Sequence, residues 1–273
     1  MNKIKSSTIT FLLISLLFFN FGCAIGIAES DGPSWLKKGT FVTYSIEPTI
    51  VRFANGSIRN TKSDTSVIYS WKCVEIRNNL AEIKVTLDYE TEQSTINMSK
   101  IVYIDVLTRE VFFSNGTLIG SSWLWVQPYP VQDECFVLLN TSQNELVGYV
   151  DGAGDRPMYY DTQIQEFQKA FLLAVNGTLD GKDIASLALI FDFNTGILLS
   201  GSPTVSEPTF VALGIKNFLL SQLFLVNTNI DLGPAELSFK IREALPYVAL
   251  ISAFILITIS IYFKNKKKKV KNN

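Results

Sequence analysis

The chain has 273 residues, of which 47% are hydrophobic, with 24 basic and 25 acidic residues and no histidine. Without histidine, the Ser-His-Asp and Cys-His triads and most zinc sites are excluded, whereas chemistry based on paired carboxylates is not. All 25 acidic residues lie between Glu29 and Glu243, where 16 basic residues leave a net charge of -9. Because such a domain repels nucleic-acid phosphates, we expect no nucleic-acid partner.

Residues 1–28 have the pattern of a signal peptide. Two lysines precede an apolar run from Ile9 to Phe19, and small residues stand at positions -3 and -1 relative to a cut after Ala28. These features predict secretion and cleavage near Ala28. Two alternatives are an uncleaved anchor and lipidation at Cys23, although Asn20 stands where a lipidation motif has leucine.

Residues 29–233 are predicted to form a β-rich extracytoplasmic domain, because short segments with strand patterns alternate with turn signals. The clearest case is a hairpin of 67–76 and 80–90, whose turn contains Asn78 and Asn79. The other expected strands cover 40–46, 100–106, 110–114, 117–126, 136–140, 145–150, 185–193, 197–200 and 219–227. This pattern predicts a mainly β fold, as an antiparallel meander, sandwich or part-barrel.

One short helix is expected within this domain, over residues 162–175. Ile164, Phe167 and Phe171 recur at intervals of three and four, with polar residues between them. The alternative is a strand through 171–175.

Two turns share an Asp-x-x-Thr motif, at Asp105–Thr108 and Asp192–Thr195. Asp and Thr side chains stabilise turns by bonding local backbone groups, so two similar hairpin turns explain the likeness. The alternative is an internal duplication.

Two cysteines remain after signal cleavage, Cys73 and Cys135. In an oxidising compartment such a pair is expected to form a disulfide, worth about 4 kcal/mol in the chain-entropy model. The alternative is two buried free thiols.

Five N-x-S/T sequons predict glycosylation if the host has the machinery. Three of them contain Asn-Gly, which is also a favoured hairpin turn. The acceptor residues are Asn55, Asn97, Asn115, Asn140 and Asn176.

Two further segments were considered as ligand sites. Trp123–Pro130 is rich in aromatic residues and proline; it could line a ligand site, although Trp123 and Trp125 fit the core better. The glycine-rich loop 151–155 could offer oxygen ligands to Ca²⁺, but it lacks EF-hand spacing and fits a solvated turn better. We therefore expect no metal site, no cofactor and no assignable catalytic residue.

The C-terminal end predicts a membrane anchor. After a juxtamembrane linker at 234–243, residues 244–263 carry no charge. As a helix with a rise of about 1.5 Å per residue, they would span roughly 30 Å, the thickness of the bilayer hydrocarbon. The lysine-rich tail at 264–273 then predicts a cytoplasmic C-terminus and a single-pass topology, with the lipid bilayer as partner.

Three segments carry a resemblance to known proteins: Ser34–Tyr44, Phe191–Leu199 and Phe224–Ile230. Together they resemble uncharacterised archaeal surface proteins with a C-terminal anchor, which implies location and no activity. The Asp-x-x-Thr-Gly hairpin is also similar to turns in LolA-like lipoprotein carriers, which implies a sheet curved around a lipid.

The leading hypothesis is a membrane-anchored cell-surface protein that acts in binding or envelope structure, with an unknown ligand. One alternative is a carrier of lipid or another hydrophobic ligand on a curved β-sheet. A second alternative is a hydrolase that uses carboxylates.

Overall fold

The computed structural model describes residues 32–233, except 48, 141–144, 154–157, 180–181, 203–206 and 220. It describes no side chain at 139–140, 179 or 182–186. The predicted signal peptide, linker, transmembrane helix and tail lie outside the described residues. No helix in the described part of the chain has the length and apolarity needed to span a bilayer.

The described residues form strands and one short helix. The strands are β1 (Phe41–Ile46), β2 (Ile50–Phe53), β3 (Ile58–Asn60), β4 (Val67–Arg77), β5 (Leu80–Glu90), β6 (Thr95–Asp105), β7 (Glu110–Phe112), β8 (Leu118–Ser121), β9 (Cys135–Asn140), β10 (Glu145–Asp151), β11 (Met158–Tyr160), β12 (Gln168–Leu179), β13 (Lys182–Asp192), β14 (Leu198–Gly201), β15 (Ile215–Leu219) and β16 (Leu223–Thr228). The helix is α2 (Pro208–Ala212). The prediction of a mainly β domain is confirmed.

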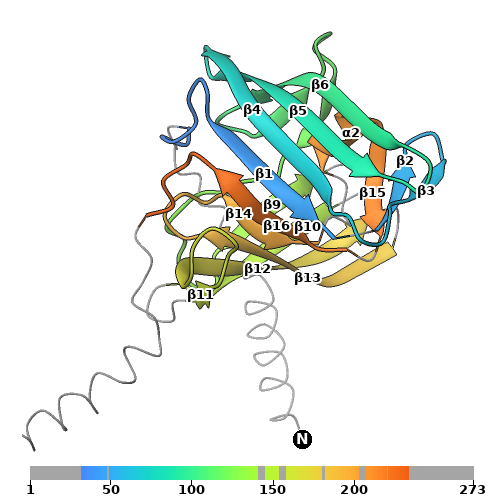
Figure 1. The fold of residues 1–273 in the computed structure, drawn as a ribbon. Coiled ribbons are helices and arrows are strands. Elements are labelled where there is room, and N and C mark those ends of the chain that lie inside the picture. Colours follow the sequence, from blue (N-terminus) through green and yellow to red (C-terminus); the bar gives the residue numbers. More distant parts are fainter. Residues whose placement is uncertain are drawn as a thin grey trace, which may run out of the picture.

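Counted over the described residues, thirteen strands form one antiparallel sheet in the order β8-β7-β6-β5-β4-β1-β16-β14-β13-β12-β10-β9, with β11 paired to β12. Strand β1 pairs with β16 from Val42↔Thr228 to Ile46↔Leu223, which joins the early half of the chain to the late half. The sheet curls into a nearly closed, barrel-like form, as Figure 1 shows, and β8 and β9 come close without ladder pairing. A small sheet, β15-β2-β3, lies beside it.

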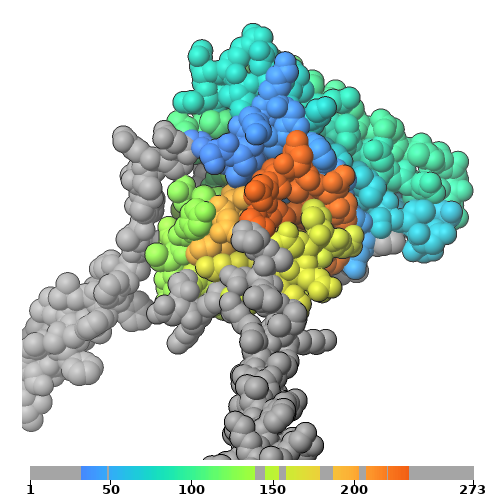
Figure 2. All heavy atoms as spheres, turned by 60° about the vertical axis from the view of Figure 1, so that its left-hand side comes forward, coloured from blue at the N-terminus to red at the C-terminus, as the bar shows by residue number. Residues whose placement is uncertain are grey.

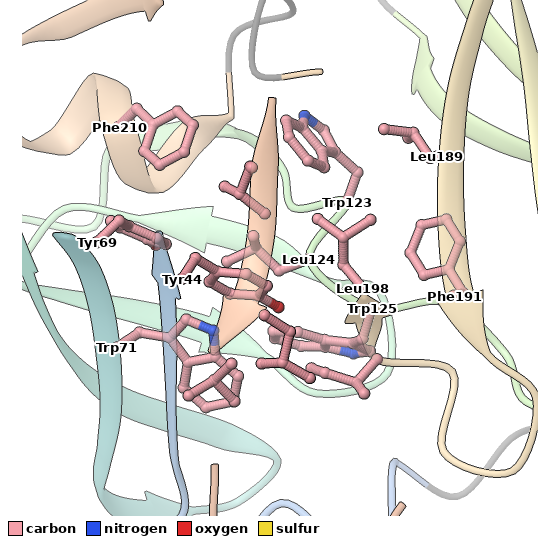
Figure 3. Close-up of a cluster of buried hydrophobic side chains, with 14 of the residues drawn as sticks. Tyr44, Tyr69, Trp71, Trp123, Leu124, Trp125, Leu189, Phe191, Leu198 and Phe210 are labelled. Atoms are coloured by element: carbon pink, nitrogen blue, oxygen red, sulfur yellow. The ribbon is translucent and has the colours of Figure 1, made fainter. Parts of the chain in front are cut away.

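The core fills the space between the two halves of the long sheet. Along β1 and β5, and along β4 as far as Cys73, every second residue is buried, as expected for strands with one dry face. Figure 3 shows side chains from the early strands facing those from the late strands, with Trp123–Trp125 between them. The large side chains of this aromatic cluster are at most 3% exposed: Tyr44, Tyr69, Trp71, Trp123, Trp125, Phe171, Phe191 and Phe210.

The predicted hairpin of 67–76 and 80–90 is confirmed as β4 and β5. Its turn holds Asn78 and Asn79 at φ 47° and 64°, which is the left-handed pair that a two-residue type I′ turn requires. Asn adopts this region more readily than most other non-glycine residues, so the two asparagines suit the turn of this hairpin.

The predicted helix over 162–175 is wrong, and the alternative strand is correct. Strand β12 starts at Gln168, and Phe171, Leu173 and Val175 are buried at a period of two. Before it, Thr162 Oγ1 accepts a hydrogen bond from Gln165 N at 2.8 Å and closes a turn. The apparent helical spacing arose because Ile164 lies in the turn whereas Phe171 lies in the strand.

The two Asp-x-x-Thr motifs form similar turns, as predicted. Asp105 Oδ1 accepts hydrogen bonds from two backbone N–H groups of its turn, both at 2.9 Å. Asp192 Oδ1 does the same, at 3.1 and 2.7 Å. Each turn ends on a left-handed residue, Arg109 at φ 63° and Gly196 at φ 69°. Turn chemistry accounts for this likeness, and duplication is not needed.

The predicted Cys73–Cys135 disulfide is wrong, because Cys73 is a buried free thiol. Its Sγ donates to the carbonyl of Glu75 at 3.8 Å, and burial raises its pKa. Strand β4, which carries Cys73, pairs with β1 and β5, whereas Cys135 begins β9 at the end of the strand order. The prediction paired the two cysteines because both lie at apolar strand positions, but the strand order puts them in different parts of the sheet.

Candidate functional site

A groove of about 510 Å³ lies where the three segments that carry the resemblance meet. Figure 2 shows the early segment, in blue, packed against the late one, in orange, on one face of the molecule. The groove combines aromatic, amide, hydroxyl and charged side chains. It is lined by Ser34, Trp35, Lys37, Thr40, Tyr129, Asn194, Thr195, Asn229, Ile230, Asp231 and Gly233.

Trp35 forms the wall of the groove that adjoins the core. Its indole Nε1 donates to the carbonyl of Thr195 at 2.8 Å. Its ring lies 5.9 Å from Trp125, edge to face, and 6.2 Å from Trp71. Trp35 is half-buried, so it continues the aromatic cluster outward to the groove. Because its one polar atom is satisfied internally, its contribution to a ligand is the ring.

The floor of the groove is the turn after β13. Asp192 is fully buried and accepts hydrogen bonds from Thr195 N and Thr195 Oγ1, at 2.7 and 2.6 Å. Burial raises the pKa of Asp192, and the hydrogen bonds from Thr195 and Gln168 act in the opposite direction. Gln168 Nε2 donates to Asp192 and also to the carbonyl of Leu232, at 2.8 Å for the latter. The floor is thus a network whose polar groups are paired.

The wall on the late segment is held by side-chain amides. Asn229 Oδ1 accepts from Phe41 N at 2.9 Å, and its Nδ2 donates to the carbonyl of Gly39 at 3.1 Å. Asn194 Nδ2 donates to the carbonyl of Leu232 at 3.2 Å. These bonds join residues far apart in the chain, so the walls are fixed by the fold and do not depend on a ligand.

Tyr129 is the exposed aromatic side of the groove. It is 63% exposed, and its backbone has φ 55°. For a non-glycine residue this conformation costs about 1–3 kcal/mol and persists only where the surroundings enforce it. Here Tyr129 N donates to the carbonyl of Phe193 at 3.0 Å, and the two rings meet edge to face at 5.6 Å.

Two charged groups in the groove are available to a ligand. Lys37 is exposed and takes part in no ion pair among the described residues. Asp231 accepts from Gly233 N through Oδ1 at 2.9 Å, and no hydrogen bond to its Oδ2 is found in the described part. Among the described lining residues, one cation and one anion leave no net charge.

The residues predicted as sites lie elsewhere. Neither Cys73 nor Cys135 lines the groove, and no sequon asparagine does. Of the five sequons, Asn55, Asn97, Asn115 and Asn176 are exposed, and the side chain of Asn140 is outside the described residues. Exposure is required for glycosylation, which stays a prediction.

The Trp123–Pro130 segment divides between the core and the surface. Trp123 and Trp125 are 3% exposed and belong to the core, as expected. The whole stretch 122–126 is buried, and β8 ends at Ser121, so the predicted strand 117–126 is too long. Tyr129, further along, reaches the groove.

Sequence reasoning missed two charged residues beside the core, the buried Glu207 and the half-buried Arg109. Glu207 caps α2 and accepts from Ser122 Oγ at 2.8 Å and from Trp123 N at 2.9 Å. Its complete burial raises its pKa to about 7. Arg109 donates to the carbonyls of Ser122, Trp125 and Val137 at 3.4, 3.1 and 3.4 Å. The one available signal was Glu207 before a proline, a helix-start pattern.

Neither of these two residues is placed to act on a substrate. Glu207 is 0% exposed, and its carboxylate oxygens accept hydrogen bonds from Ser122 and Trp123. Within the described residues, no cluster of three Asp, Glu or Cys side chains could hold a metal ion. The groove is therefore the candidate site, and Glu207 and Arg109 are structural.

No protein-family model and no curated protein matches the sequence. Two solved structures match: a protein described as exported, with a YmcC-like fold, from Bacteroides fragilis, and a protein described as a lipoprotein from Parabacteroides distasonis. The chain is 7% and 8% identical to them; each match covers 73% of this chain and 100% of the other, with a TM-score of 0.30. At this TM-score they carry no argument about fold or function. The resemblances to archaeal surface proteins and LolA-like carriers stay predictions.

Proposed function

We propose that this protein is a membrane-anchored cell-surface protein whose β domain binds a ligand in the groove between Trp35, Tyr129 and Asp231. The observation that carries the proposal is a preformed groove of about 510 Å³ with aromatic and charged side chains on rigid walls. Ligand sites typically have roughly 300–1,000 Å³ and a few placed polar groups.

The position of the groove supports a role close to the membrane. Gly233 lines the groove, and ten residues, 234–243, separate it from the predicted transmembrane segment. Fully extended, ten residues reach at most about 36 Å. If that anchor forms, the groove lies within this distance of the bilayer surface.

The chemistry of the groove favours binding over hydrolysis. A glycosidase needs two carboxyl groups on opposite sides of the bond that it cleaves. Among the described residues, the groove is lined by one carboxyl group, that of Asp231. The hydrolase alternative therefore has less support than binding.

The packing of the interior favours a surface site over a lipid cavity. The aromatic cluster between the two halves of the sheet is filled by its own side chains. The cavity beside Trp123 has a volume of about 10 Å³, which holds one water molecule at most. This cavity therefore offers an acyl chain no space.

The test is thermal unfolding of the full-length chain in detergent with a panel of neutral oligosaccharides, short peptides, nucleotides and long-chain fatty acids. A ligand that binds only the folded state raises Tm by mass action. We expect a soluble ligand class to raise Tm, and the Ser34→Trp variant, which fills the groove, to abolish the shift.

The matched control is Ser63→Trp, at an exposed serine outside the groove, which should keep the shift. A panel without any stabilising ligand would overturn the groove as a binding site. Stabilisation by fatty acids that survives Ser34→Trp would support the carrier alternative instead.

A further inference from the structure

We infer that the groove takes a neutral carbohydrate chain, with one sugar ring packed on Tyr129. This inference rests on the proposed function and names the ligand class of the same site. Its basis is an exposed aromatic ring held rigidly next to a charge-balanced set of hydrogen-bonding groups.

Tyr129 is preorganised to receive a flat apolar face. Its backbone is fixed in the left-handed region by the bond to Phe193, and its ring is fixed by the edge-to-face contact with that residue. Phe193 is itself held by Phe171 at 6.4 Å and by Lys169 Nζ, 3.9 Å from its ring centroid. A tyrosine ring immobilised in advance loses little entropy when a ligand packs on it.

A sugar ring has the chemistry that complements this tyrosine. The C–H groups on one face of a pyranose carry partial positive charge, and the face of an aromatic ring is electron-rich. An aromatic side chain that is 63% exposed is otherwise unfavourable in water, so this contact also removes apolar surface from solvent.

The polar groups around Tyr129 match sugar hydroxyls. Lys37 offers only donors, the free oxygen of Asp231 only accepts, and the hydroxyl of Ser34 does both. A sugar hydroxyl donates one hydrogen bond and accepts others, so it pairs with such a mixture. A phosphate or an anionic headgroup needs a surplus of cationic donors, and the described lining, with one lysine and one aspartate, does not supply it.

The fold also disfavours a peptide bound by strand addition. That mode needs an unpaired strand edge beside the site. Strands β1, β14 and β16, which adjoin the groove, are each paired on both sides. A peptide could therefore contact side chains in the groove but could not add a strand to the sheet there.

The experiment is a glycan array followed by titration calorimetry with the best neutral oligosaccharide, on the full-length chain in detergent. We expect saturable binding that falls by about tenfold or more in Tyr129→Ala, a loss equal to about 1.4 kcal/mol. Tyr129→Phe keeps the ring and should stay within about threefold of the parent, and Asp231→Asn should weaken binding. Tyr149→Ala, at an exposed tyrosine outside the groove, is the matched control and should bind like the parent.

Each other outcome has a definite meaning, provided that the variants melt like the parent. Glycan binding that Tyr129→Ala does not weaken overturns the stacking inference. If no neutral glycan binds while peptides or nucleotides stabilise the parent but not Ser34→Trp, the groove stays a binding site and the carbohydrate inference is wrong. If no member of either panel binds, both proposals fail.

Discussion

Glu207 is the residue whose ionisation has the clearest consequence for stability. It is fully buried, and desolvation raises its pKa from the ordinary 4.5 to about 7, although Trp123 N, Ser122 Oγ and Thr209 donate to it. The folded protein thus binds this proton more tightly than the unfolded chain does. The stabilisation is complete below about pH 4.5 and is lost as the pH rises through about 7.

We predict that Glu207→Gln removes this pH dependence. In the parent chain, the contribution of Glu207 to the free energy of unfolding should fall by about 3 kcal/mol between pH 4.5 and 8, at 1.36 kcal/mol per pKa unit. Urea titrations at both pH values give the change in the free energy of unfolding with pH for each protein. The change in the parent minus the change in Glu207→Gln is the contribution of Glu207. Glu145→Gln, at an exposed glutamate, is the control and should keep the parent's slope. A parallel slope in parent and Glu207→Gln would show that the carboxyl group titrates normally.

Gly196 is the residue at which the backbone approaches another segment most closely beside the groove. Its φ is 69°, and a Cβ there would lie 2.0 Å from the carbonyl oxygen of Val126. Gly196 N also donates to the carbonyl of Asp192 at 2.9 Å. Any side chain must therefore displace the buried segment that follows β8.

We predict that Gly196→Ala destabilises the fold by at least about 2 kcal/mol, since it adds a clash to the cost of positive φ. Gly56→Ala separates the two effects, because Gly56 has φ 85° and nothing within 4 Å of the added Cβ. It should cost only about 1 kcal/mol. Urea unfolding at one pH compares them, and equal losses would mean that the contact with Val126 does not constrain the turn.

At the scale of elements, the side chain of Arg109 connects the two ends of the sheet, where strands β8 and β9 form no backbone ladder. The ends of the strand order, β8 and β9, approach each other without pairing. Arg109, directly before β7, donates to the carbonyl of Val137 on β9 and to those of Ser122 and Trp125. Burial lowers its pKa. A single guanidinium thus links both ends of the sheet.

We predict that Arg109→Met lowers the free energy of unfolding by about 3 kcal/mol or more, because buried carbonyls lose charged donors. Hydrogen exchange should also quicken first in β8 and β9. Arg77→Met is the control: Arg77 is exposed and pairs with Glu75 at 2.6 Å, an arrangement that contributes little. If Arg109→Met unfolds at the same urea concentration as Arg77→Met, the two ends of the sheet are held by other contacts.

The elements that could be predicted are those with local signals. Alternation and two asparagines were enough for the β4–β5 hairpin, and the Asp-x-x-Thr motifs were enough for two turns. Phe167, at φ 53°, has a backbone conformation that ends the turn before β12 and that a helix does not allow. No residue type within 162–175 indicated this conformation. Four short strands were missed, namely β2, β3, β11 and β15. They have three to five residues, a length at which a period is not decisive, although the three-residue β7 was predicted within 110–114.

At the scale of the whole molecule, the groove could not be predicted, although its segments were singled out. Trp35 and Thr195, which share a hydrogen bond, are 160 residues apart in sequence. Their meeting depends on the β1–β16 and β14–β16 ladders, which close the sheet between early and late strands. Long-range pairing of this kind has no local sequence signal. The same limit explains the wrong cysteine pair, since strand order decides which core positions meet.

The proposed surface role of the groove depends on a predicted topology in which the β domain lies outside the membrane and the lysine-rich tail lies inside. Ser34 is an exposed residue of the groove, so a cysteine placed there reports on which side of the membrane the groove lies. The most direct test is labelling of Ser34→Cys on intact cells with a membrane-impermeant maleimide, with the parent chain as background and Asn273→Cys as the cytoplasmic control. We expect Ser34→Cys to be labelled on intact cells and Asn273→Cys only after lysis. Labelling of Ser34→Cys only after lysis would place the groove on the inner side of the membrane and contradict the proposed surface function.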